Sequence, residues 1–205
     1  MRKIVMFFAG MLISGVSYSQ TFMHGAGFGS FGVIADNKST GDQDANVYVT
    51  FSYSPRFSFV EGESMSLSVG VPITAGFSGS YSYSSSSYYG TEESNTLTYM
   101  VSVPVMIDFN FGAGAHKEVE ERFGFFIGGG FGLFHGTVAT EYYDPNYYDF
   151  YTQTDQVTTT GPVGNIGFRI AVGRNQKNIE TKITYMKGIT NRKPHVFGLG
   201  VAFNF

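Results

Sequence analysis

Alternation of apolar with small or polar side chains is the feature of this sequence that most constrains its fold. Over residues 96–109, apolar or aromatic residues occupy every second position, from Leu97 to Phe109, and Thr, Met, Ser, Pro or Asp stand between them. Residues 64–77 and 46–59 show the same pattern. Successive side chains of a β-strand point to opposite faces, so each segment predicts a strand with one oily face and one polar or small face.

Eight segments carry such a pattern, and nothing beyond the N-terminal region repeats at the 3.6-residue period of a helix. The sequence therefore predicts an all-β fold of about eight strands, an even number as in single-chain outer-membrane barrels, with ten as the alternative. The expected strands cover residues 22–34, 45–59, 64–77, 96–109, 122–138, 162–174, 179–187 and 196–205.

The connections alternate in length, as the short periplasmic turns and long outer loops of such barrels do. Long polar connections are expected at residues 35–44, 78–95, 139–161 and 188–195, and tight turns at 60–63 and 175–178. The charged connection 110–121 is the exception, because the count places it on the periplasmic side although it is long.

Arg169 decides which face meets lipid. An arginine on the lipid face at the bilayer midplane costs roughly 2 to 4 kcal/mol, so Arg169 is expected inside and Ile166 and Phe168 outside. A hairpin around residues 175–178 would place Arg169 opposite Thr184.

Composition distinguishes this chain from a soluble β-sandwich or lipocalin-like barrel, whose outer face is charged. Charged residues make up 14% of the sequence, against about 25% in soluble domains. The pattern therefore favours a closed antiparallel up-and-down transmembrane β-barrel, with glycines such as Gly128 leaving room for larger luminal neighbours.

The N-terminus predicts export. Arg2 and Lys3 precede an apolar run of thirteen residues, and Ser17 to Ser19 form a small-x-small site, as in a cleavable signal peptide. We expect a signal peptide at residues 1–19 and a barrel domain at 20–205, located in the cell outer membrane. A retained membrane anchor is the alternative, although the run is short of the about twenty residues that a spanning helix needs.

Charge and cysteine content exclude several functions. The formal net charge is −3 and there is no cysteine. The absence of a Lys/Arg cluster argues against nucleic-acid partners, and the absence of thiols excludes disulfides and thiolate chemistry.

The segment VSVPVMIDFNFG, followed by FFIGGGFGLF, resembles the small outer-membrane β-barrels called PorT-like. The resemblance extends over essentially the whole mature chain and carries no catalytic residue. It implies location and fold, and leaves the activity open. The terminal strand, which finishes in Phe205, is similar to the C-terminal signal that the barrel-insertion machinery recognises.

Catalytic, cofactor and metal sites are not predicted. His24, His116, His135 and His195 lie on separate segments without ligand spacing. A lipid A deacylase-like hydrolase, which uses His and Ser, is the enzymatic alternative, without matching His-Ser spacing here. The acidic residues Glu92, Glu93, Asp144 and Asp149 are interpreted as solvated loop charges.

Two groups of residues are candidates for function. The first is a luminal charge network that would plug a narrow barrel. It consists of Arg56, Asp108, Arg169, Glu180 and Lys182.

The second group is tyrosine in the expected outer loops, where Tyr and Ser are a mixture typical of binding surfaces. Its members are Tyr81, Tyr83, Tyr88, Tyr89, Tyr142, Tyr143, Tyr147, Tyr148 and Tyr151. An interfacial aromatic girdle, or strands extended beyond the membrane, is the alternative interpretation of these residues.

The predicted function is that of a non-enzymatic outer-membrane barrel that presents these loops for a structural or binding role. A narrow channel or transport or secretion accessory is the first alternative, and the lipid hydrolase is the second. The expected partners are outer-membrane lipid and lipopolysaccharide, the insertion machinery during biogenesis, and an extracellular ligand of unknown identity.

Overall fold

The computed structural model describes residues 21–36, 43–86, 90–116, 119–144, 149–173, 177–190 and 192–205. The predicted signal peptide, residues 1–19, lies outside these ranges. All regular secondary structure in the described residues is β-strand. Among these residues, no helix is long and apolar enough to cross a membrane.

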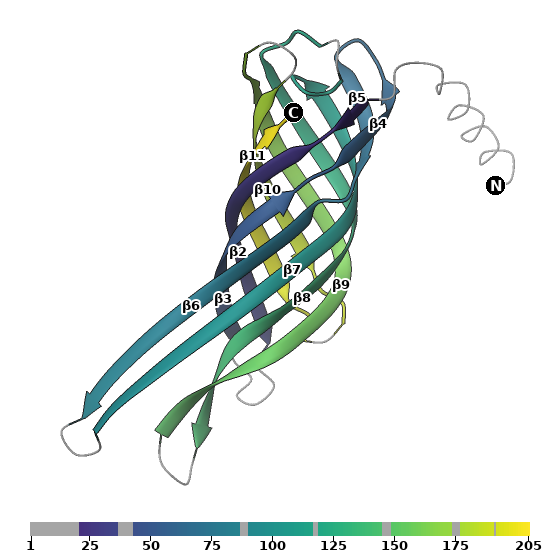
Figure 1. Ribbon diagram of the computed structural model, residues 1–205. Coiled ribbons are helices and arrows are strands. Elements are labelled where there is room, and N and C mark those ends of the chain that lie inside the picture. Colours follow the sequence, from purple (N-terminus) through teal and green to yellow (C-terminus); the bar gives the residue numbers. More distant parts are fainter. Residues whose placement is uncertain are drawn as a thin grey trace, which may run out of the picture.

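The strand segments close into a ring of antiparallel neighbours, and this confirms the predicted fold class (Figure 1). The ring closes because the last strand, His195–Asn204, pairs with Gly25–Asp36, and Gly90–Gly112 pairs with Phe123–Asp144. In chain order the segments are β1 (Thr21–Met23), β2 (Gly25–Asp36), β3 (Gln43–Tyr53), β4 (Arg56–Glu61), β5 (Met65–Gly70), β6 (Ile73–Ser86), β7 (Gly90–Gly112), β8 (Phe123–Asp144), β9 (Asp149–Ala171), β10 (Asn178–Lys187) and β11 (His195–Asn204).

Eight positions in the ring hold eleven segments because three predicted strands are each interrupted once. The interruptions fall at His24, at Ser54 and Pro55, and at Val71 and Pro72. Proline has no N–H to donate to a strand ladder, which explains the last two. The pairs β1–β4 and β4–β5 continue the wall beyond these breaks.

Two of the predicted outer loops are mostly strand, so these two predictions are wrong. The segments predicted as connections 78–95 and 139–161 form the β6–β7 hairpin, paired out to Ser86 and Gly90, and the β8–β9 hairpin, paired out to Asp144 and Asp149. Figure 1 shows both hairpins reaching past the ring at one end. Strands outside a membrane have no face to bury, so their sequences lose the apolar alternation that marks the wall.

The predicted pairing of Arg169 with Thr184 is also wrong, since Arg169 lies opposite Glu180. Gly173 has φ +72°, and the Val172 N–H donates to the Lys177 carbonyl at 2.7 Å, so the turn closes earlier than expected. The shift is four residues, an even number, so every side chain keeps its predicted face.

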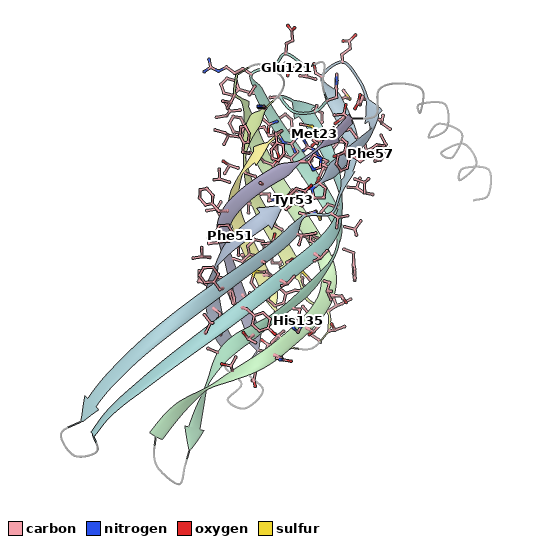
Figure 2. The ribbon with its side chains drawn as sticks, viewed as in Figure 1. Met23, Phe51, Tyr53, Phe57, Glu121 and His135 are labelled. Carbon is pink, nitrogen blue, oxygen red and sulfur yellow. The ribbon has the colours of Figure 1, made fainter. Side chains whose placement is uncertain are left out.

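Apolar side chains cover the outside of the wall, as the alternation predicts. Phe51 and Tyr53 project outward from β3 (Figure 2). On β9, Ile166 is 54% exposed, whereas Arg169 is 1% exposed and faces the interior. The last strand is outward-facing at Phe197, Leu199, Val201, Phe203 and Phe205.

Candidate functional site

A buried ionic cluster occupies the half of the barrel interior near the chain's C-terminus. Arg169 of β9 and Glu180 of β10 are opposite in register, and Arg169 Nε lies 2.8 Å from Glu180 Oε2. Arg56 of β4 reaches the same carboxylate oxygen at 3.9 Å. These three side chains are the part of the predicted network that the structure brings together as an ion-paired group.

Asparagines complete this cluster. Arg169 Nη1 donates to Asn110 Oδ1 at 2.8 Å, and Asn204 Nδ2 donates to Glu180 Oε2 at 3.1 Å. The Arg169 guanidinium also stacks 4.2 Å above the ring of Phe126, an arrangement that suits its weak hydration. Asn110 and Asn204 were not among the predicted luminal residues, although both occupy the inward phase of their strands.

Asp108 and Lys182 stand apart from the ion-paired group. Both line a cavity of about 30 Å³ beside it, which has room for no more than a few water molecules. Lys182 Nζ donates to Ser54 Oγ at 3.4 Å. In the described residues, Oδ1 of Asp108 and Oδ1 of Asn165 are buried without a hydrogen-bond partner.

The turn after β7 folds into the barrel and seals the same end. Ala113, Ala115 and His116 are buried, at 1%, 0% and 6% exposure. Arg56 Nη2 donates to the Gly114 carbonyl at 3.0 Å, and Ser66 Oγ donates to the Ala115 carbonyl at 2.6 Å. The sequence predicted only a long, charged connection here, so its role as a plug was missed.

The other half of the interior is apolar, which corrects the expectation of a hydrophilic or small-residue lumen throughout. Large side chains cluster there across the barrel. The cluster consists of Phe31, Val33, Tyr48, Met100, Met106, Phe134, Val138, Val157, Val163, Met186 and Val196. The alternation within a strand identifies its inward face. It does not show which large side chains, such as Met, Val and Phe, meet at the same height in the barrel.

Hydrogen bonds across the lumen close the end of the apolar half. Asn46 of β3 donates through Nδ2 to the Ala139 carbonyl at 3.4 Å, and it accepts at Oδ1 from the Ala139 N–H at 3.2 Å. The Tyr48 hydroxyl donates to the Thr137 carbonyl. Strands β3 and β8 are not ring neighbours, so these bonds bridge the mouth of the barrel.

The histidines do not converge. His24 contacts the Tyr53 hydroxyl, and His135 contacts Tyr99 and Thr158. His195 contacts Tyr185, whereas His116 is buried in the turn after β7, where its Nε2 lies 3.2 Å from the Glu63 carbonyl. Within the part of the chain that the structure describes, no three His, Asp or Glu residues are grouped to hold a metal ion.

The candidate tyrosines divide between described strands and residues outside the description. Tyr88, Tyr89, Tyr147 and Tyr148 lie outside the described residues. The backbone of the others lies in the extended hairpins, with Tyr81 and Tyr83 on β6, Tyr142 and Tyr143 on β8, and Tyr151 on β9. Tyr142 and Tyr151 are opposite each other in register.

Comparison with solved structures gives the same architecture. Neisserial surface protein A is similar to this chain with a TM-score of 0.51 at 13% identity, covering 91% of this chain and 98% of that one. Ail of Yersinia pestis gives 0.49 at 12% identity, with coverage of 90% and 99%. OprG of Pseudomonas aeruginosa gives 0.49 at 11% identity, with coverage of 93% and 98%.

The closed ring and its oily exterior, together with the likeness to Neisserial surface protein A, define the fold as that of an eight-stranded outer-membrane β-barrel. At such identities the likeness concerns the fold alone. No family model matches the chain, and no curated protein matches it in sequence.

Proposed function

We propose that this chain is a non-enzymatic outer-membrane protein whose filled barrel anchors two long hairpins outside the cell as a binding surface. The observation that carries the proposal is the contrast between the two parts. Side chains fill both halves of the barrel interior, whereas the strands of the two hairpins continue beyond it.

The hairpins extend well past the wall that supports them. Strand β6 pairs with β3 only as far as Phe77 but continues to Ser86 beside β7. Strands β7 and β8 separate beyond Met100 and Gly136, and β8 continues to Asp144 beside β9. At about 3.3 Å per residue, each hairpin projects roughly 25 to 30 Å. A structural role alone does not require that length.

The filled interior supports an anchor over the channel alternative. An eight-stranded barrel is just wide enough for its own side chains, and both the ionic cluster and the apolar cluster occupy that space. The proposal includes export by a signal peptide at residues 1–19, insertion by the barrel-assembly machinery and contact with outer-membrane lipid. Membership of the PorT-like family is part of the same proposal and rests on the sequence resemblance.

The binding role is tested with a shortened hairpin. In this variant an Asn-Gly turn replaces residues 81–95 and joins Ser80 to Thr96, which are opposite in register. Full-length and shortened chains in nanodiscs are applied to an array of defined glycans. Tyr supplies rigid contact area and Ser adaptable hydrogen bonding, and the hydroxyl groups of a sugar can bond to both side chains. We expect at least tenfold weaker binding from the shortened chain. Equal binding by both chains, or none by either, would contradict this role.

The two alternatives have their own tests. Purified barrel in planar bilayers should show no stable open-state current, and a reproducible conductance would favour the channel. Mass spectrometry of lipid A from cells with and without the chain should show unchanged acylation, since a lost acyl chain would indicate a hydrolase.

A further inference from the structure

His195 stands on the outside of the barrel where the apolar band ends. Toward the C-terminus from it, the outward face of β11 carries Phe197, Leu199, Val201, Phe203 and Phe205, all exposed. Ten residues separate Phe205 from His195, about 34 Å along a strand and roughly 26 Å across the membrane at a tilt near 40°. The apolar band of such barrels is about 25 Å tall, so His195 lies at the level of lipid headgroups on the hairpin side.

A lysine and a tyrosine adjoin this histidine on the same face. Lys187 of β10 is opposite His195 in register, which brings their Cβ atoms to about 5 Å. The Tyr185 hydroxyl lies 2.8 Å from His195 Nδ1. When that hydroxyl donates to Nδ1, the Nε2–H of the imidazole is left as a donor.

The connection between these two strands contributes further cations. Arg192 is engaged, because its Nη1 lies 3.2 Å from Asp155 Oδ2 and its Nε donates to the Asp36 carbonyl at 2.9 Å. Lys193 is exposed. In the described part of the chain, neither Lys187 nor Lys193 has an ion-pair partner.

The two rims differ in charge. Around the opposite end, the described exposed or half-exposed charges are mostly acidic. They are Glu61, Glu63, Glu120 and Glu121 against Arg122 and Lys177. On the hairpin side the described acidic residues at the rim are Asp36 and Asp155, and Asp155 is paired with Arg192. Glu93 stands farther out, six residues beyond Tyr99 along β7, or about 20 Å.

We propose that Lys187, Lys193 and His195 bind the phosphate of a phosphorylated glycolipid in the surrounding membrane, with Tyr185 orienting the imidazole. The occupant is a lipid because the cationic group continues directly from the apolar face of Phe197 and Leu199. Acyl chains lie against that face, while an anionic headgroup reaches the donors of Lys187, Lys193 and His195 at its edge. The inference rests on the proposed outer-membrane location.

Titration of the full chain with bisphosphorylated lipid A, followed by native mass spectrometry from detergent micelles, tests the site. The double variant Lys187→Gln/Lys193→Gln should bind about 25-fold more weakly, since each surface cation contributes about fivefold. His195→Gln should weaken binding by a smaller factor. The matched control Arg122→Gln/Lys177→Gln removes the same charge from the opposite rim and should bind as the wild type does.

The site would be overturned by equal losses in the two double variants, by unchanged binding in the first, or by equal wild-type affinity for dephosphorylated lipid A. Inorganic phosphate that competes fully at equal concentration would show phosphate binding without lipid selection, which also contradicts the proposal. Heat-shifted gel mobility of each variant reports the folded barrel separately. A folded, outer-membrane chain with no phosphate preference would therefore refute this site and leave the proposed function standing.

Discussion

Arg169 has only 1% of its surface exposed, yet it is tolerated because its donors and its flat face are satisfied. Its partners are the Glu180 carboxylate, the Asn110 side chain, the Gly114 carbonyl and the Phe126 ring. A buried ion pair of this kind contributes little net stability against an apolar replacement, whereas removing one partner leaves an uncompensated charge. The cluster therefore favours one arrangement of β9, β10 and the inward turn.

Glu180→Gln tests this interpretation at the level of one residue. The substitution leaves Arg169 and Arg56 facing each other without their shared carboxylate, and we expect a loss of about 3 to 5 kcal/mol of unfolding free energy. Urea unfolding in lipid, followed by gel mobility, measures it. The double variant Arg169→Met/Glu180→Gln should recover much of the loss, and a single variant within about 0.5 kcal/mol of wild type would contradict the account.

Gly128 is a second residue-scale test, because Asp108 and Asn165 meet over it from the two neighbouring strands. A Cβ built at Gly128 would lie 2.5 Å from Asn165 Oδ1 and closer still to Asp108 Oδ1, whereas one at Gly129 has its nearest neighbour at 3.9 Å. Gly128→Ala should cost about 1 to 3 kcal/mol by overpacking. Gly129→Ala is the matched control, and Asp108→Ala should rescue part of the loss. Equal effects of the two alanines on the urea midpoint would refute the packing.

At the scale of elements, the wall and the hairpins obey different constraints. Wall strands pair on both edges and expose one face to lipid, so their alternation is strict. Beyond Phe77 and Met100 the β6–β7 hairpin pairs only internally, so no wall pairing depends on its length. The base of the β8–β9 hairpin differs, because Thr137 and Ala139 are hydrogen-bonded across the lumen to Tyr48 and Asn46.

Shortening the β6–β7 hairpin should therefore leave the barrel intact. In the variant with an Asn-Gly turn in place of residues 81–95, we expect an unfolding free energy within about 0.5 kcal/mol of wild type, because no wall pairing is lost. The urea midpoint of the gel shift measures this. A drop of several kcal/mol would show that the hairpin is part of the barrel's core and not an appendage.

For the whole molecule, the two-residue period of a strand explains why the sequence predicts the two faces of the wall well. The inward and outward faces were predicted correctly even where the register was wrong, because the Arg169 pairing slipped by an even number of residues. The inward turn was not predictable, because Ala113 to His116 have no periodicity and are held by luminal partners distant in sequence. The apolar half of the interior was missed because alternation along one strand does not show what lies across the lumen.

Only some of the predicted luminal residues touch one another, because contacts across the lumen cannot be predicted from single strands. Arg169 and Glu180 meet because they are hairpin neighbours, and Arg56 joins them only through the closure of the ring. Asp108 meets Asn165 over a glycine, a contact that depends on β8 lying between their strands. Sequence therefore identified which residues face inward, and the ring closure determined which of them touch.

The most direct test of the account is a spin-label accessibility scan along β7, for which the absence of native cysteine leaves each introduced thiol unique. Single cysteines at Val101, Val105 and Ile107 are compared with cysteines at Ser102 and Met106, in lipid bilayers. The account predicts that labels at the first three collide with oxygen but not with a water-soluble nickel chelate, and that labels at the other two are shielded from both. Free access of the nickel chelate to Val105 and Ile107 would contradict a membrane-facing wall, and access to Ser102 and Met106 would contradict a filled interior.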